Sequence, residues 1–226
     1  MRSVQLRLDL PSPYVHPMHA FVAETSGFRA TRLRHWNPAV GQRNTLVFFV
    51  DGDDPDAYAA ALAEQESILE YEVATEESRR GFHLVVTEDQ RSADARLTAA
   101  FLNTGVVVVP PIVYRDDRCI DLSIVGAPDE VETAIDGLPS DVGVTVRRIR
   151  SYDGRFTDPT AALTPRQREA LRVAVRCGYY NETRETTVDT IAAELGCSAG
   201  TAAEHLRKAE ATGLRRVVDA TPGGRA

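Results

Sequence analysis

The sequence predicts an α+β protein, with a tandem ferredoxin-like (βαββαβ) domain at residues 1–150 and a small all-α helix-turn-helix domain at residues 163–226. Three observations support this prediction. Within residues 1–150 the order strand, helix, strand, strand, helix, strand occurs twice. Residues 151–162 (SYDGRFTDPTAA) are polar and contain Gly and Pro, which is typical of a linker. Residues 163–226 show helical periodicity.

The first repeat begins with a half-buried strand at residues 4–10, where apolar and polar residues alternate. Its second helix begins where Asp54 serves as a cap and Pro55 takes the first helical position. The same kinds of pattern predict a helix at 16–25, strands at 28–36 and 45–51, an end of the second helix near residue 66, and a strand at 68–74.

The second repeat has a similar layout. We expect strands at 82–87, 106–109, 118–125 and 142–149, with helices at 94–103 and 128–136. Pro110 and Pro111 interrupt the second of these strands. Each repeat alone is too small to bury much of a core. We therefore expect the two repeats to pack sheet to sheet or to form one continuous sheet.

The second domain begins with a well-capped helix. Thr164 is placed to cap it, Pro165 takes the first helical position, and Gln167 can complete a capping box. This helix is expected to end near Arg176, before Gly178.

Residues 187–213 predict two further helices joined by a tight turn. Thr187 caps the first, and Gly196 ends it in a left-handed conformation that a side chain would oppose. Ala192 is small enough for the two helices to cross closely. Ser198 caps the second helix, which we expect to run over residues 199–212 and to stop at Gly213. The alternative is an ordinary helical hairpin; the turn chemistry and both caps favour a helix-turn-helix.

The formal net charge of −7 is unusual for a DNA-binding protein, but the charge is unevenly distributed. From Leu163 onward there are ten Lys and Arg against eight Asp and Glu, so the helix-turn-helix region is the relatively basic end. Lys208 is the single lysine. An acidic chain with almost no lysine suggests a salt-loving organism.

Several classes of protein are disfavoured. No apolar run is long enough for a membrane helix, and the first ten residues lack the apolar region of a signal peptide, so we expect a cytoplasmic protein. Three widely spaced cysteines favour neither a disulfide framework nor a zinc site. The acidic run at residues 51–56 lacks the glycine and distal glutamate of a calcium loop. With no nucleophile motif either, we expect no enzyme activity, no cofactor and no metal.

The segment at residues 163–210 resembles a known family. Leu-Thr-x-x-Gln at its start, Gly-Tyr-Tyr before the next helix and Glu-His-Leu-Arg-Lys-Ala-Glu at its end are marks of the bacterio-opsin activator regulators of haloarchaea. The resemblance implies a helix-turn-helix that binds double-stranded DNA. It also implies that the preceding domain, which resembles the family more loosely, senses a signal or mediates contacts.

In such a motif the second helix enters the major groove, so its first turns should contain the base readers. Here that region is short of long polar side chains, and specificity then rests on few base contacts or on DNA shape. The arginines of the first helix are equally well explained as a solvated face, and Glu204 with Lys208 as a surface pair. The predicted DNA-binding residues are Ser198, Ala199, Gly200, Thr201, Ala203, Glu204, Arg207, Lys208, Arg166 and Arg184.

One helix-turn-helix covers one half-site, so we expect a homodimer formed through the N-terminal domain. That domain could also bind a small-molecule effector or a protein partner. Two alternatives remain open at this level: a metabolite-binding module, and a protein-interaction adaptor whose helix-turn-helix binds DNA weakly or without specificity.

Overall fold

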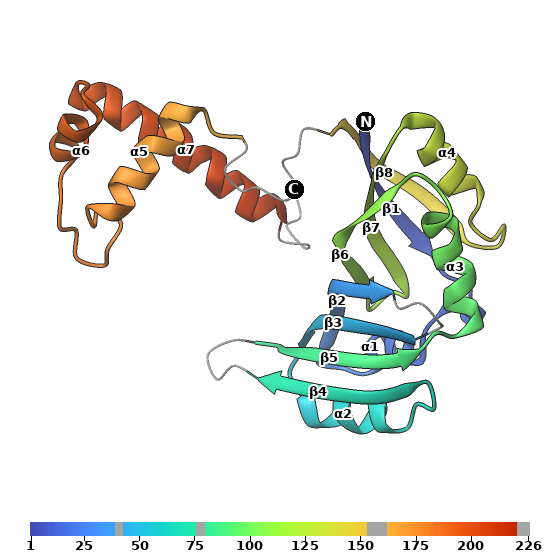
Figure 1. Ribbon diagram of the computed structural model, residues 1–226. Helices are drawn as coiled ribbons and strands as arrows, with labels where there is room; N and C mark the ends of the chain where they lie inside the picture. Colours follow the sequence, from blue (N-terminus) through green and yellow to red (C-terminus); the bar gives the residue numbers. More distant parts are fainter. Residues whose placement is uncertain (39–42, 76–79, 153–161, 221–226) are drawn as a thin grey trace. The chain divides into compact units, whose positions relative to one another are not determined.

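The computed structural model describes residues 1–38, 43–75, 80–152 and 162–220, with only the backbone of Pro38 and of residues 216–220 (Figure 1). The chain divides into two compact units, Met1–Tyr152 and Asp153–Ala226, called here the N-terminal and C-terminal units. Most of the predicted linker lies outside the described residues. Its first residue, Ser151, ends a strand, and the backbone N–H of Tyr152 donates to the carbonyl of Met1 at 3.2 Å.

In its described residues, the N-terminal unit contains the eight strands and four α-helices that the sequence predicts, together with one short 3-10 helix. Their bounds are β1 (Arg2–Asp9), η1 (Ser12–Tyr14), α1 (Pro17–Glu24), β2 (Phe28–Pro38), β3 (Arg43–Gly52), α2 (Pro55–Ala63), β4 (Ile68–Thr75), β5 (Phe82–Asp89), α3 (Ser92–Leu102), β6 (Val107–Arg115), β7 (Cys119–Gly126), α4 (Pro128–Asp136) and β8 (Gly143–Ser151).

The strands form one continuous antiparallel sheet in the order β4-β5-β3-β2-β6-β7-β1-β8. β1 lies between β7 and β8, and β5 lies between β3 and β4, so the sheet does not divide into two sets of consecutive strands. The sheet has two halves, β4-β5-β3-β2 and β6-β7-β1-β8. Only four residue pairs join them, where Ala30–Leu33 of β2 face Ile112–Arg115 of β6. The expectation of one continuous sheet is met, but each half contains the first strand of the other repeat.

β6 ends later than the sequence predicts. The sequence suggests that Pro110 and Pro111, which are joined by a cis peptide bond, end the strand; instead it continues to Arg115. Proline has no backbone N–H to donate to a sheet. The pairing with β7 therefore shifts register between Val109 and Val113, and residues 112–115 pair with β2 on the other side.

The helices lie against one face of the sheet. α1 and α2 accompany the half formed by β2 to β5, and α3 and α4 accompany the other half (Figure 1). Two apolar clusters fill the space between helices and sheet. The first contains Leu6, Ile124 and Phe101, and the second contains Val50, Tyr58 and Leu84. Burial of these side chains is the main favourable contribution to folding.

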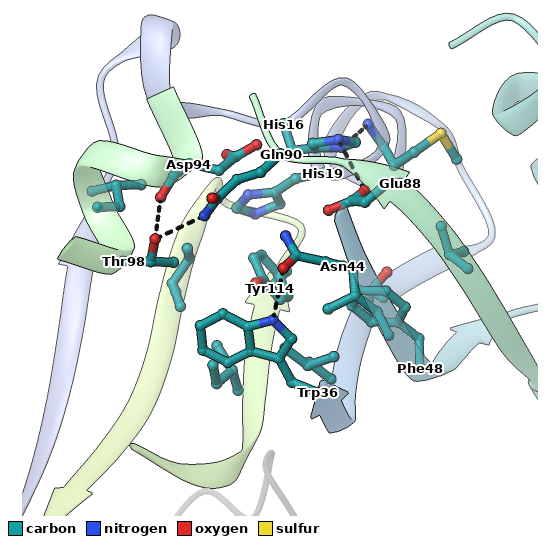
Figure 2. A pocket seen from close by; sticks show the side chains of 18 of the residues that line it. His16, His19, Trp36, Asn44, Phe48, Glu88, Gln90, Asp94, Thr98 and Tyr114 are labelled. Carbon is teal, nitrogen blue, oxygen red and sulfur yellow. Dashed lines mark hydrogen bonds and ion pairs between the residues drawn. The ribbon is translucent and has the colours of Figure 1, made fainter. Parts of the chain in front are cut away.

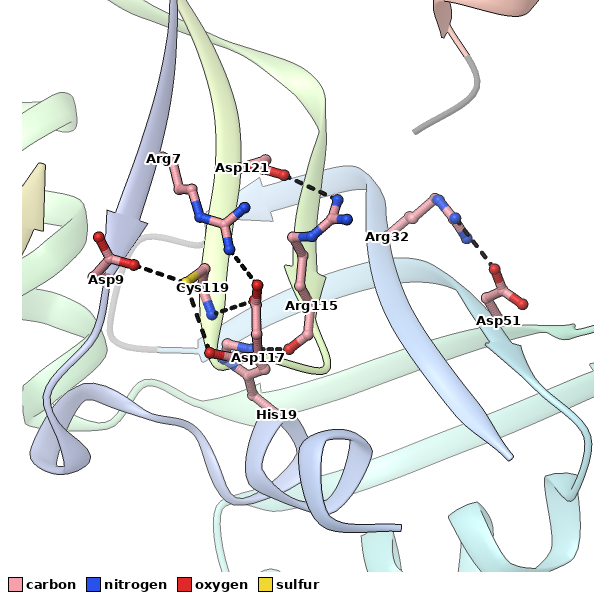
Figure 3. Close-up of polar contacts among 9 residues, drawn as sticks. All are labelled: Arg7, Asp9, His19, Arg32, Asp51, Arg115, Asp117, Cys119 and Asp121. Atoms are coloured by element: carbon pink, nitrogen blue, oxygen red, sulfur yellow. Dashed lines mark hydrogen bonds and ion pairs between the residues drawn. The ribbon is translucent and has the colours of Figure 1, made fainter. Parts of the chain in front are cut away.

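The opposite face of the sheet carries ion pairs between arginine and aspartate. Arg115 contacts Asp121 at 3.1 Å and Arg32 contacts Asp51 at 3.3 Å (Figure 3). Such partly exposed pairs each contribute little to stability. Asp54 caps α2 by accepting from the backbone N–H of Ala57 at 2.9 Å. Three members of the acidic run at residues 51–56 thus have partners within the protein, because Asp53 also contacts Arg80 at 2.7 Å.

The C-terminal unit contains α5 (Pro165–Arg176), α6 (Val188–Leu195) and α7 (Ala199–Ala220). The predicted stop at Gly213 is wrong, because α7 continues through this residue. Gly213 is not among the residues with positive φ, and a methyl group there would meet nothing within 4 Å. A glycine can occupy a helix interior at a modest cost, so it does not by itself end a helix.

Candidate nucleic-acid interface

The turn between α6 and α7 has the geometry that the sequence predicts. Gly196 has a φ of 63°, in the left-handed region. Its N–H donates to the carbonyl of Ala193 at 3.2 Å, and the N–H of Cys197 donates to that of Ala192 at 3.0 Å. Together these bonds satisfy carbonyls at the end of α6 and redirect the chain within two residues. α7 therefore begins immediately after α6 ends.

The starts of all three helices are capped by hydroxyl groups. Thr164 and Gln167 form a reciprocal capping box, with N···O distances of 3.0 and 3.3 Å. Thr187 accepts from the N–H of Thr190 at 3.5 Å, and Ser198 accepts from the N–H of Thr201 at 3.2 Å. These bonds fix where each helix begins. The first N–H groups of α7 point out of the helix end, where an anion can bind them.

A small apolar core holds the three helices together. Ala192 is 3% exposed where α6 meets α7, and Ala202 is fully buried on the facing helix. Cys177 and Cys197 are partly buried against this core. Alanines at these positions let the helices approach closely, and a larger side chain at Ala192 would force them apart.

The face of α7 opposite this core is exposed. Nine of the ten predicted DNA-binding residues are exposed, and Ala199 is partly buried because it packs against the core. On α7, Gly200, Glu204 and Arg207 lie on the side away from Leu206, which is 2% exposed. A Cβ at Gly200 would meet nothing within 4 Å. The exposed face of α7 is thus accessible and has few long side chains.

The charged side chains near this face differ in whether they already form an ion pair within the protein. Lys208 contacts Glu204 at 2.6 Å, and this hydrogen bond lowers the pKa of the Glu204 carboxyl below its usual value. Within the described part of the chain Arg207 has no acidic partner at salt-bridge distance. Arg207 is therefore a cation on the exposed face of α7 that can bind DNA without first leaving a carboxylate.

The two other predicted basic residues lie elsewhere on the C-terminal unit. Arg166 on α5 contacts Glu169 at 2.7 Å. The guanidinium of Arg184 lies 4.2 Å from the ring centroid of Tyr179, a cation–π contact that orients it without neutralising its charge. Tyr180 donates to Glu210 of α7 and so ties the loop to the long helix.

Two comparisons with known proteins bear on this geometry. Residues 163–213 match a family model described as an HTH DNA binding domain. Residues 16–152, more than half of the chain, match a family model described as HVO_0513, N-terminal. The chain belongs to the bacterio-opsin activator family. This family has a helix-turn-helix DNA-binding domain after an N-terminal domain, and it points to a regulator rather than an enzyme.

A relative with a known role is the dimethyl sulfoxide reductase transcriptional activator of Haloferax volcanii. It is 32% identical over 114 residues, which cover 47% of this chain and 49% of the relative. The chain thus matches about half the length of this family member. No helix among the described residues is both long enough and apolar enough to span a membrane.

None of the three cysteines forms a disulfide bond. Cys119 at the start of β7 is buried, and its thiol donates to a carboxylate oxygen of Asp9 at 2.8 Å (Figure 3). Burial raises the pKa of this thiol to about 11, so the thiolate needed for redox or metal chemistry is disfavoured. Within the described residues, no cluster of His, Cys, Asp and Glu side chains is arranged to hold a metal.

Sequence reasoning missed a second candidate site, a partly open cavity of about 160 Å³ in the N-terminal unit (Figure 2). Its walls are mainly apolar and aromatic, but His16, His19, Glu88 and Asp94 also line it. His16 immediately precedes α1, and His19 lies within this helix three residues further along the chain. Their helical spacing was the one available sign that they face the same space.

Proposed function

We propose that this chain is a sequence-specific transcription regulator that acts on DNA in the cytoplasm. The observation that carries this proposal is the α6–α7 pair, with its left-handed turn at Gly196, its small-residue core and its exposed outer face on α7. A helix presented in this way can enter the major groove with its first turns toward the bases.

We assign the base contacts to Thr201, Glu204 and Arg207. Arg207 is suited to guanine, and Glu204 can accept from the amino group of cytosine once Lys208 releases it. Ala203 can touch a thymine methyl, and Gly200 allows the DNA to approach the helix closely.

The phosphate contacts are assigned to residues around this face. They are the hydroxyl of Ser198, the first N–H groups of α7 at Ala199 and Gly200, and the side chains of Arg166, Arg184 and Lys208. Arg166 and Lys208 already contact carboxylates in the free protein, so each gains less from a phosphate than a free cation would. Binding should therefore be less steeply salt-dependent than for a strongly basic domain.

Genome-wide occupancy in the native host tests this proposal, because it measures DNA binding and identifies target sites together. Wild-type protein should occupy discrete sites, and Arg207→Ala should lose most of that occupancy. Arg29→Ala, which removes an exposed arginine from β2, a strand inside the sheet rather than at either edge, is the matched control and should retain it. Uniform occupancy that Arg207→Ala leaves unchanged would instead support an adaptor role.

Dimerisation through the N-terminal unit is part of the proposal. The described sheet ends at β4 on one side and at β8 on the other, and both strands expose apolar side chains. Tyr71 of β4 is 40% exposed and Ile149 of β8 is 55% exposed. An edge of this kind is a template for pairing with a second copy. Light scattering at micromolar protein in molar KCl should show a dimer, and a monomer would count against it.

Two substitutions locate the interface. Ile149→Glu should dissociate the dimer if β8 forms it, and Tyr71→Glu should do so if β4 forms it. Each variant is the control for the other, because both place a carboxylate on an exposed edge strand.

Effector sensing by the N-terminal unit is supported by the cavity. We interpret the sheet as two ferredoxin-like units that have exchanged β1 and β5, since each half then has the order fourth, first, third, second strand. The cavity lies where the two halves meet and is lined by strands of both. A ligand there contacts both halves and can change their relative geometry.

A further inference from the structure

The cavity offers a ligand an apolar environment of limited size. Trp36, Phe48 and Tyr114 contribute aromatic rings, and Leu33 and Leu122 contribute aliphatic walls from β2 and β7. An engineered apolar cavity of about 150 Å³ holds a benzene molecule. A cavity of about 160 Å³ therefore suits a ligand built around one ring or a short branched chain.

Of the two histidines, His16 offers the cavity an N–H donor and His19 offers it an acceptor nitrogen. The Nδ1 atom of His16 accepts from the N–H of Met18 at 3.1 Å, so Nε2 has the proton, and it lies 3.8 Å from a carboxylate oxygen of Glu88. The Nε2 atom of His19 donates to the carbonyl of Arg115 at 2.8 Å (Figure 3). Its Nδ1 atom is then an unprotonated acceptor.

This Nδ1 atom indicates which kind of group the cavity can bind. His19 is 3% exposed, and within the described residues Nδ1 has no hydrogen-bond partner. An unpaired buried acceptor is costly, so a donor is expected to meet it in the functional complex. Figure 2 places the His19 ring and the Glu88 carboxylate on the same side of the cavity, above Trp36 and Tyr114.

Among the described residues, no arginine or lysine lies at salt-bridge distance from Glu88, and only the more distant charge of Arg91 acts to lower the pKa of its carboxyl. Burial lowers the pKa of His16 to about 4 and also lowers that of His19, so both rings are neutral at physiological pH. Arg91 contacts Asp94 at 3.3 Å and the carbonyl of Val15 at 3.4 Å instead.

The groups that face Glu88 come from several elements. They are His16 before α1, Tyr58 of α2, Arg91 and Asp94 around the start of α3, and Tyr114 of β6. Burial, together with Asp94, raises the pKa of Glu88 to about 7. A carboxyl in that state gains from a cation that enters the cavity, because the cation stabilises its ionised form.

We propose that this cavity binds a small amphipathic amine, whose ammonium group donates to Glu88 and to Nδ1 of His19 while its apolar body packs against Trp36, Phe48 and Tyr114. The aromatic rings add a favourable cation–π contribution. An anion would meet two carboxylates and no free cation, and a neutral hydrocarbon would leave Nδ1 of His19 unpaired. The inference rests on the effector role proposed for the N-terminal unit.

Binding of benzylamine to the full chain tests the ligand class. The single tryptophan, Trp36, lines the cavity, so its fluorescence reports occupancy directly. At pH 8 in molar KCl we expect saturable binding of benzylamine, with toluene weaker and benzoate weakest. Glu88→Gln should weaken benzylamine binding by about tenfold or more while leaving toluene binding unchanged. The matched control, Glu72→Gln on exposed β4, should bind like the wild type.

Equal binding of benzylamine and benzoate, no saturable binding of benzylamine, or benzylamine binding that Glu88→Gln leaves intact would each overturn the proposed ligand class. A separate measurement addresses the sensing role: the affinity for an occupied DNA site with and without saturating benzylamine. Glutamate-dependent amine binding with unchanged DNA affinity would support the site and overturn the sensing role. Loss of DNA binding in all conditions would instead overturn the proposed regulator function.

Discussion

Gly196 and Gly213 should respond in opposite directions to the same substitution. Both lie in the C-terminal unit, and a Cβ at either would meet nothing within 4 Å. They differ in backbone conformation: Gly196 has a φ of 63° at the end of α6, whereas Gly213 lies within α7. Steric clashes therefore do not contribute, and the effect of each alanine comes from the backbone alone.

The expected magnitudes follow from this difference. A left-handed conformation costs an L-residue about 1–2 kcal/mol, so Gly196→Ala should destabilise the C-terminal unit by roughly that amount. In a helix interior alanine is favoured over glycine by about 0.5–1 kcal/mol, so Gly213→Ala should stabilise it. For a domain of this size each kcal/mol corresponds to about 4–8 °C in the midpoint of thermal unfolding.

Thermal unfolding of the full chain, followed by circular dichroism at the helical band, measures both effects. Trp36 fluorescence follows the N-terminal unit in the same sample and should show no change with either substitution. A decrease in midpoint with Gly213→Ala would refute a helix that continues through this residue, and no decrease with Gly196→Ala would refute the left-handed turn.

Three other predictions test other parts of the molecule. Thr164→Ala removes the capping box of α5 and should cost about 1 kcal/mol in the unfolding free energy, whereas Thr183→Ala in the exposed loop should cost little; equal costs would contradict the cap's role. For Arg207→Ala, we expect a loss of about 1–3 kcal/mol in affinity for an occupied site and relaxed specificity at one base pair, and a loss that is uniform across sequences would reassign the residue to a phosphate. Glu88 has a folded pKa of about 7 against 4.5 for the free side chain, so its own contribution to stability should fall as pH rises from about 4.5 to 7, by on the order of 2–3 kcal/mol, whereas the lowered pKa of His16 contributes a rise as pH increases from about 4 to 6.5. Denaturant titrations at pH 5 and pH 8 should therefore show the wild type losing that much stability relative to Glu88→Gln; the same change in both proteins would mean that Glu88 makes no such contribution.

The ion pairs on the sheet should respond to the salt concentration. Arginine, not lysine, faces aspartate at Arg32–Asp51 and Arg115–Asp121. High salt screens exposed pairs of this kind, so their removal should matter less in molar KCl than in dilute buffer. The charge pattern therefore says more about solubility than about the fold.

The helix-turn-helix could be predicted from the sequence because its determinants are local. A cap such as Ser198 acts on an N–H three residues away, and Gly196 acts through its own φ angle. Neighbours in the sequence are neighbours in space here, so each residue type specifies its geometry directly. Gly213 shows the limit of this reasoning, since a glycine permits a helix end without requiring one.

The arrangement of the N-terminal unit depends on long-range pairing instead. The strand patterns identify β1 and β5 but contain no information on which neighbours they join, because either position buries the same apolar face. Only the exchange of these two strands brings Glu88 of β5 and Tyr114 of β6 to one cavity with His16 and His19. The sequence by itself determined the DNA-binding motif, whereas the tertiary structure decided the cavity proposed as a ligand site, because contacts between distant segments create it.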